Sequence, residues 1–221
     1  MSATEITQKQ YEEVMGENPS WFQISNEGLI NEEKKQLKNT SNNPVETVNW
    51  YDAIYFCNKL SERFGFIPVY SVNGTTDVTK WNYTPHEDNS IYGVTWNKTA
   101  NGFRLPTVEE WQYAAKGGQN YTYSGSDNLD EVGWYLKNSG DKTHSVAQKK
   151  ANGYGLYDMS GNVWEWCWDV DPDFRSLRYN CGGGYRYDYY NGDYKVSYRD
   201  NYDACLQRDY IGFRIVCSAS N

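Results

Sequence analysis

The sequence lacks the features that mark several common classes of protein. No apolar run approaches the roughly 18 residues that a membrane-spanning helix needs, so no transmembrane segment is predicted. Lysine and arginine form no block, and the formal net charge is −8 with a pI near 4.8. Such a surface repels phosphate backbones, so nucleic acid is not an expected partner. The first residues, MSATEITQ, lack the basic and apolar regions of a signal peptide, which indicates a cytosolic protein or a mature or trimmed N-terminus.

Motifs for metal binding and nucleophilic catalysis are also scarce. The five cysteines form no CxxC pair and are accompanied by only two histidines, so a tetrahedral zinc site has little support. No Gly-x-Ser-x-Gly elbow is present, and neither histidine lies in a context typical of a catalytic base. Cys57 and Cys217 have apolar neighbours and are expected to be buried thiols. Cys181 and Cys205 flank a Tyr-rich stretch, and a disulfide between them stays open.

Helix signals occur in three places. Residues 7–15 begin with a Thr-x-x-Gln capping box and stop at a glycine. Residues 49–65 place apolar side chains at the 3.6-residue period, between an asparagine cap and a glycine. Residues 106–118 contain a second capping box at Thr107 and Glu110, which explains Glu110 better than a catalytic acid pair with Glu109 does. Short segments and turns fill the rest, so we predict a single α+β domain over residues 1–221.

The aromatic residues are abundant, with nine tryptophans and 21 tyrosines, and one dense group lies in NGYGLYDMSGNVWEWCWD, residues 152–169. Its tryptophans alternate at the period of a β-strand. Asp158 and Glu165 bracket a Gly-Asn turn, and two carboxylates with turn carbonyls could form an oxygen cage for calcium. The alternative is that both acids are only solvated or cap the local backbone.

The other dense group is GGGYRYDYYNGDYKVSYRDNYDAC, residues 182–205, with seven tyrosines, four aspartates and two asparagines. This is the composition of an antibody paratope, in which tyrosine supplies contact area and short polar residues supply hydrogen bonds. A packed sheet face is the alternative, but the aspartates would then lose their solvation, and the pair Tyr189 and Tyr190 breaks strict alternation. We therefore predict an exposed binding surface. Tyr and Asp codons also arise when an adenine of an Asn codon is replaced, so adenine-directed diversification would produce such a segment.

Several stretches together resemble the formylglycine-generating, or sulfatase-modifying-factor, family: TEITQKQYEEVMG, NPVETVNWYDAIYFCNKL, GFRLPTVEEWQYAAKGG, NGYGLYDMSGNVWEW, the CGGGY turn and GFRIV. They follow the family's order from about residue 4 to residue 216. The resemblance implies a C-type-lectin-like fold of the formylglycine-generating-enzyme type, with two or three helices, short strands and long loops. The family usually has a glycine-rich region before the EIT segment, so the chain is expected to have a truncated or short N-terminus.

The family's oxidase chemistry is not expected here. Active members place one cysteine after a Gly-Gly-Ser turn and a second five positions later, and this pair binds copper. The corresponding positions are Tyr187 and Gly192, so no soft site for copper remains and the chain is predicted not to be an enzyme. One calcium site of the family maps onto suitable residues, whereas the other is expected to be absent because Val132 replaces its asparagine. The implied calcium ligands are Asp158, Gly161, Val163 and Glu165.

A lectin-like frame, a lost copper site and a segment rich in Tyr, Asp and Asn are similar to the variable proteins of diversity-generating retroelements. That resemblance implies a non-enzymatic protein that binds a protein or another macromolecule through residues 178–211, at the cell surface or outside the cell. Anchoring as a lipoprotein would need a leader that this sequence does not contain. The alternatives are a copper-dependent oxidase and a calcium-dependent carbohydrate-binding lectin. The predicted ligand contacts are Tyr185, Tyr187, Asp188, Tyr190, Asp193, Tyr194, Tyr198, Asp200, Asn201, Tyr202, Asp209 and Tyr210.

Overall fold

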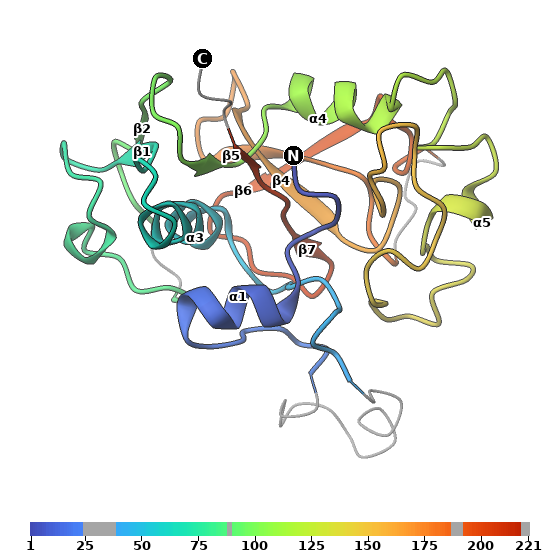
Figure 1. Ribbon diagram of the computed structural model, residues 1–221, viewed down its shortest axis with the longest axis horizontal. Coiled ribbons are helices and arrows are strands. Elements are labelled where there is room, and N and C mark those ends of the chain that lie inside the picture. The colour runs from blue at the N-terminus through green and yellow to red at the C-terminus, as the bar shows by residue number, and fades with distance from the viewer. Residues whose placement is uncertain (24–38, 88–89, 187–191, 218–221) are drawn as a thin grey trace.

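A four-stranded sheet forms the centre of the protein (Figure 1). The computed structural model describes residues 1–23, 39–87, 90–186 and 192–217. The strand order is β6-β5-β4-β7, with antiparallel pairs except for the parallel pair of β4 and β7. Two smaller sheets pair β1 with β2 and β3 with β8. The strands are β1 Tyr70–Ser71, β2 Thr95–Trp96, β3 Phe103–Arg104, β4 Trp164–Val170, β5 Leu177–Cys181, β6 Arg199–Asp203, β7 Ile211–Gly212 and β8 Val216–Cys217.

The three predicted helices are confirmed, together with their end signals. Thr7 caps the first and Thr107 caps the third through the capping boxes expected from the sequence. Asn49 caps the second and forms a further capping box with Asp52. None of the helices along the described part of the chain combines the length and apolar character needed to cross a bilayer. The helices are α1 Gln8–Met15, α3 Trp50–Arg63, α4 Val108–Lys116, the short α5 Leu129–Val132 and the 3-10 helix η1 Val78–Lys80.

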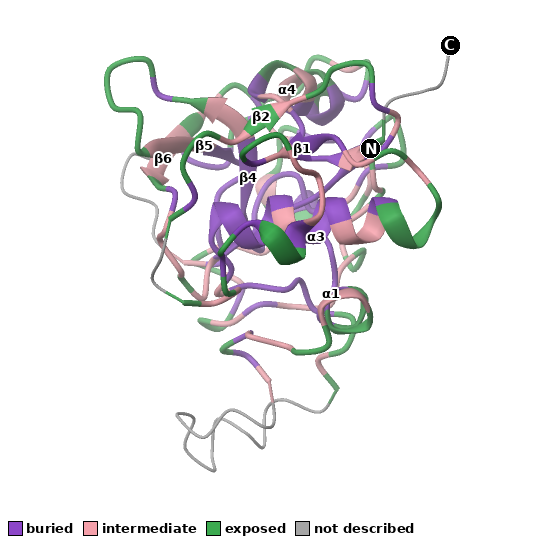
Figure 2. Cartoon of the chain, turned by 90° about the vertical axis from the view of Figure 1, so that its left-hand side faces the viewer, coloured by how far each residue is buried: buried purple, intermediate pink, exposed green. Residues whose placement is uncertain are grey.

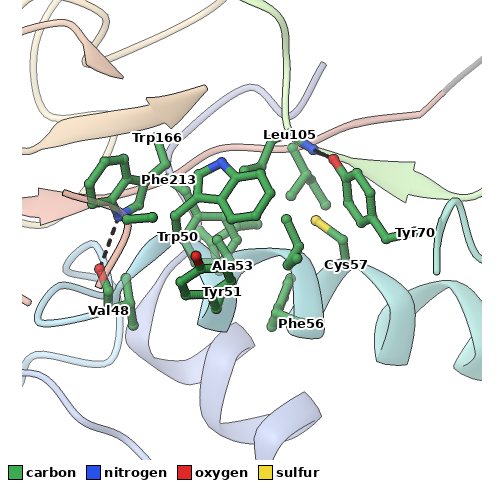
Figure 3. Close-up of a cluster of buried hydrophobic side chains, with 14 of the residues drawn as sticks. Val48, Trp50, Tyr51, Ala53, Phe56, Cys57, Tyr70, Leu105, Trp166 and Phe213 are labelled. Carbon is green, nitrogen blue, oxygen red and sulfur yellow. Dashed lines mark hydrogen bonds between the residues drawn. The ribbon is translucent and has the colours of Figure 1, made fainter. Parts of the chain in front are cut away.

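The central sheet packs between α3 and α4 (Figure 2). The alternation in β4 directs Trp166 into the larger core cluster and Cys167 into the cluster beneath α4. The Nε1 of Trp166 donates to the carbonyl of Val48 at 3.0 Å (Figure 3), and the Nε1 of Trp50 donates to the carbonyl of Cys167 at 2.9 Å. Because each buried indole N–H finds an acceptor, the core can consist largely of aromatic rings without stranding their polar atoms.

The cysteines correct one expectation and confirm another. Cys57 is buried, as predicted, but Cys217 is exposed. The two-residue strand β8 pairs with β3, and its alternation turns Val216 inward and Cys217 outward. Cys181 is buried beneath α4 and Cys205 is partly exposed, and no disulfide joins them.

Candidate ligand-binding surface

The predicted contact residues occupy different environments. Tyr187, Asp188 and Tyr190 lie outside the described residues. Three others are buried, so the prediction that they face solvent is wrong: Tyr185, Asp193 and Tyr194, with exposed fractions of 0 %, 3 % and 2 %. Six are half-buried and present part of their side chains to solvent: Tyr198, Asp200, Asn201, Tyr202, Asp209 and Tyr210.

Tyr185 is buried because it is part of the frame. Its ring packs edge-on against Phe22, with 5.3 Å between centroids, and its hydroxyl donates to Oδ2 of Asp209 at 2.8 Å. Its backbone N–H donates to the carbonyl of Asn162 at 2.7 Å. Burial and the charge of Asp209 raise the pKa of Tyr185. The residue joins the N-terminal part of the chain, at Phe22, to the glycine turn that follows β5, which is a structural role.

Tyr194 is enclosed because the glycine turn passes directly against its ring. Gly183 has a φ of +77°, and a Cβ placed on it would lie 2.5 Å from Cδ1 of Tyr194. On its other side the ring of Tyr194 meets that of Tyr135 edge-on, with 5.6 Å between centroids. Only glycine allows this approach without displacing the ring. The sequence signal was present in the Gly-Gly-Gly turn, but it does not identify the tyrosine on which the turn packs.

Asp209 and Tyr210 lie beside a cation that organises this part of the surface. Nη2 of Arg186 contacts both carboxylate oxygens of Asp209, at 2.7 and 2.8 Å. The same guanidinium lies over the rings of Tyr185 and Tyr210, at 5.3 and 5.7 Å from their centroids. The charge pair and the ring contacts hold Asp209 and Tyr210 in defined positions while leaving both half-exposed.

Strand β6 presents the second part of the surface from the edge of the sheet. Its five residues pair with β5 from Leu177↔Asp203 to Cys181↔Arg199. Asp200 and Tyr202 therefore project to one face and Asn201 to the other. Nδ2 of Asn201 donates to Asp171 at 2.7 Å, which fixes that side chain at the rim. The backbone ladder holds this strand whatever side chains it carries.

The turn that contains Trp21 and Phe22 forms the N-terminal wall of the surface, and it depends on a buried carboxylate that the sequence did not reveal. Glu46 accepts hydrogen bonds from the backbone N–H groups of Trp21 and Phe22, both at 2.9 Å, and from the Thr47 hydroxyl at 2.7 Å. Burial raises the pKa of Glu46 to about 8, and these hydrogen bonds oppose that rise. Glu46 thereby holds the turn whose Phe22 supports Tyr185.

The residues predicted to bind calcium lie before β4 and at its start, and the two acids among them, Asp158 and Glu165, belong to a buried charge cluster. Both oxygens of Glu165 accept from Arg214, each at 2.6 Å, and Oε2 also accepts from Nε1 of Trp111. Glu165 and Arg214 are both fully buried. Glu5, a third buried acid missed from the sequence, accepts from the Val163 backbone N–H at 3.2 Å. Burial raises the pKa of Glu5, and the neighbouring carboxylates raise it further.

The calcium ligands predicted from the resemblance fit only in part. Asp158 accepts from the Ala147 N–H through Oδ2, whereas its buried Oδ1 has no hydrogen-bond partner and could bind a cation. Burial raises the pKa of Asp158 to about 6. Glu165 does not fit, because a cation there would compete with Arg214 for both oxygens. Within the described residues, no group of three or more His, Cys, Asp or Glu side chains is arranged to hold a metal ion.

Comparisons with known proteins agree on the fold. The family model described as Sulfatase-modifying factor enzyme 1-like domain matches residues 1–219. Chaperone protein LppX of Paenibacillus barcinonensis is 41 % identical over 97 % of this chain and 78 % of LppX. The formylglycine-generating enzyme of Streptomyces coelicolor is 32 % identical over 59 % of this chain and 53 % of the enzyme.

Two solved structures are also similar over nearly the whole chain. Treponema denticola variable protein 1 has a TM-score of 0.83 at 36 % identity, covering 97 % of this chain and 82 % of that protein. CarF has a TM-score of 0.76 at 31 % identity, covering 99 % of this chain and 85 % of CarF. The predicted C-type-lectin-like fold and the resemblance to a variable protein are therefore confirmed. The chain belongs to the family of sulfatase-modifying factor enzyme 1-like domains.

Proposed function

We propose that this protein is a non-enzymatic binding protein whose ligand surface lies in residues 178–211 and is diversified by a retroelement. The observation that carries the proposal is the similarity to a variable protein over 97 % of the chain, combined with the Tyr-, Asp- and Asn-rich composition of that segment. Surface display is part of the same proposal and rests on the same similarity. The described contact residues are now the half-buried ones: Tyr198, Asp200, Asn201, Tyr202, Asp209 and Tyr210.

The geometry supports a surface that can change without loss of the fold. The backbone of β6 is paired with β5 along its whole length. Earlier in the segment, the backbone of Gly183 packs directly against the ring of Tyr194. Half-buried tyrosines offer one face to a ligand while the other face rests on the frame, so little side-chain entropy is lost on binding. Tyr187, Asp188 and Tyr190 stay predicted contacts from the sequence.

An oxidase is the less favoured function, although the family includes enzymes. The sequence has Tyr187 and Gly192 where the resemblance requires the copper-binding cysteines. Two thiols, those of Cys167 and Cys181, lie 4.0 Å apart, but both are fully buried and burial raises the pKa of Cys167. A thiol that is held protonated and away from solvent is a poor ligand for copper. Stoichiometric binding of Cu(I) by the purified chain would favour the oxidase instead.

A chaperone is a second candidate, because LppX is 41 % identical over almost the whole chain and its name describes a chaperone protein. In that case the same surface would bind a partly unfolded protein rather than a folded target. Suppression of the thermal aggregation of citrate synthase by the wild-type chain would favour this function. Loss of the suppression on replacing Tyr202 and Tyr210 together would place it on the same surface.

Calcium binding at Asp158, without the Glu165 that the resemblance implies, is a further proposal and rests on the partnerless Oδ1 of Asp158. Titration calorimetry with CaCl2 tests it on the wild-type chain and on Asp158→Asn. One calcium ion per chain that is lost in Asp158→Asn supports the site, whereas equal heats for both proteins argue against it.

Two displayed libraries test the binding function directly. In the first library, each of the six described contact positions is encoded by an Asn codon whose adenines are randomised. In the second, the same codons vary six exposed positions elsewhere: Phe64, Ile67, Tyr113, Tyr121, Leu136 and Tyr154. Both libraries are selected against egg-white lysozyme and streptavidin. We expect folded binders from the first library at a rate at least about tenfold above the second; equal rates would refute the assignment of the surface.

A further inference from the structure

A hollow of about 790 Å³ lies where β4 ends and β5 begins, and its volume falls in the range of small-molecule sites, roughly 300–1,000 Å³. Its walls come from four parts of the chain, one of which is the end of β6 with Asp203 and Cys205. Tyr51 belongs to α3, Ile91 and Val94 belong to the segment before β2, and Arg175 and Arg178 belong to the β4–β5 connection and to β5. Apolar and aromatic walls around a small number of charged groups are typical of a ligand pocket.

Arg178 is the partly buried cation of this hollow. Its guanidinium carbon lies 4.0 Å from the ring centroid of Trp50 and 5.6 Å from that of Trp168. Nη1 donates to the carbonyl of Trp168 at 3.1 Å, whereas the buried Nε has no hydrogen-bond partner. Among the described residues, no carboxylate lies within 4.0 Å of this guanidinium. Two indole faces therefore stabilise a cation whose remaining donors can serve a ligand.

The two acids in the lining do not neutralise Arg178. Asp171 accepts through Oδ1 from the backbone N–H groups of Asp173 and Phe174, and through Oδ2 from the side chains of Tyr179 and Asn201. These four hydrogen bonds lower the pKa of Asp171, so its negative charge is already satisfied by neutral donors rather than by Arg178. Asp203, the other acid, is exposed and accepts from the Cys205 N–H at 2.9 Å. The lining thus carries two arginines and two aspartates, so the attraction for an anion is local to Arg178 rather than a property of the whole hollow.

We propose that Arg178 binds the oxyanion of a small molecule, a carboxylate or a phosphate, whose apolar part lies against Tyr51, Ile91 and Val94. A planar guanidinium donates two parallel hydrogen bonds to either oxyanion, and Arg175 at the rim adds a second positive charge. The apolar walls favour an aromatic or aliphatic body over a bare ion. Arg178 lies at the start of the segment 178–211 proposed as the ligand surface, but none of these residues is among the six described ligand contacts, so the two proposals can be tested separately. The hollow borders the described contacts, since Tyr202 pairs with Arg178 across β5 and β6 and Asn201 donates to Asp171 in the lining.

Titration of the full chain with four probes tests the site: benzoate, phenyl phosphate, acetate and inorganic phosphate at constant ionic strength. The signals are tryptophan fluorescence, since Trp50 and Trp168 touch the guanidinium, and the heat of binding. We expect saturable binding of at least one aryl probe, at least about tenfold tighter than that of the matching bare ion. The two pairs of probes distinguish a carboxylate site from a phosphate site. No saturation by any probe up to about 10 mM would overturn the proposal.

Two variants locate the binding. Arg178→Gln removes the cation and is expected to weaken aryl-probe binding at least about tenfold, because charged hydrogen bonds are lost. Arg208→Gln removes an exposed arginine outside this hollow and is the matched control, expected to bind as the wild type does. Ser176→Trp leaves Arg178 in place but occupies the hollow from an exposed position, so it decides the question if Arg178→Gln does not fold. Unchanged affinity in Ser176→Trp, or in a folded Arg178→Gln, would overturn the site.

Discussion

Replacing Arg214 with methionine is expected to destabilise the protein more than most single changes. Arg214 is fully buried, and besides its two hydrogen bonds to Glu165 it donates to the carbonyl of Tyr157 at 2.9 Å. Its removal leaves the buried Glu165 carboxyl without its cationic partner, beside Glu5 and Asp158, whose pKa values burial and the neighbouring carboxylates raise. Removing one partner of a buried ion pair costs about 3–5 kcal/mol.

The measurement is equilibrium unfolding in urea at pH 7, supported by thermal unfolding. For a domain of this size, each kcal/mol shifts the melting temperature by roughly 2–4 °C, so Arg214→Met should lower it by about 6–20 °C. Arg208→Met, at an exposed position, is the control and should change stability by about 0.5 kcal/mol or less.

A double variant separates the loss of the cation from the stranding of the acid. Arg214→Met combined with Glu165→Met removes both charges and replaces them with apolar side chains of similar length. Because a buried ion pair contributes little net stability over an apolar pair, the double variant should recover most of the loss. A single variant that loses less than about 1 kcal/mol, or a double variant no more stable than the single one, would refute this account of the cluster.

Four further results are expected. Tyr194→Ala should cost about 3–5 kcal/mol in urea unfolding, whereas half-buried Tyr198→Ala should cost about 1 kcal/mol; similar losses would contradict the division between frame and surface. Gly183→Ala should destabilise the protein by at least about 1 kcal/mol more than Gly140→Ala does. Gly140 also has a positive φ, but a Cβ placed on it would have no atom within 4 Å. Because burial raises the folded-state pKa of Glu46 to about 8, the stability linked to this group should be fullest below about pH 4.5 and fall as the pH rises towards 8. Glu46→Gln should remove that part of the pH profile, and an unchanged profile would exclude Glu46 as its source. In the neighbouring DNA, a near-copy of the 3′ end should carry Asn codons at the half-buried contact positions, beside a reverse-transcriptase gene; absence of both would refute diversification.

The elements that could be predicted from the sequence are those set by short-range signals. The capping boxes at Thr7 and Thr107 lie within four residues of the helices that they begin, so their outcome depends little on the rest of the chain. The alternating tryptophans of β4 likewise indicate a strand whose faces differ. The fold itself came from the resemblance, because these signals do not say how the strands pair.

The features that could not be predicted depend on contacts between distant parts of the chain. Arg214 and Glu5 are 209 positions apart and meet at the same buried cluster, and neither has a local pattern that indicates a partner. The exposure of Cys217 depends on the pairing of β8 with β3. Composition identifies a segment rich in tyrosine, but the burial of Tyr194 depends on Gly183 and that of Tyr185 on Phe22, contacts that composition does not reveal.

The burial of Tyr185 and Tyr194 changes what diversification of this segment can mean. Both rings contact parts of the chain outside residues 178–211, namely Phe22 and Tyr135, so a change at either position would disturb the frame as well as the surface. The half-buried residues also touch the frame, as Tyr198 does at Trp164 and Asn201 does at Asp171, but each leaves part of its side chain in solvent. Exchange at these positions should therefore disturb the frame less, because the backbone ladder of β6 stays in place. A binding protein of this design therefore needs fixed tyrosines and exchangeable ones in the same short segment, and the fixed ones are those that the glycine turn and the N-terminal wall enclose.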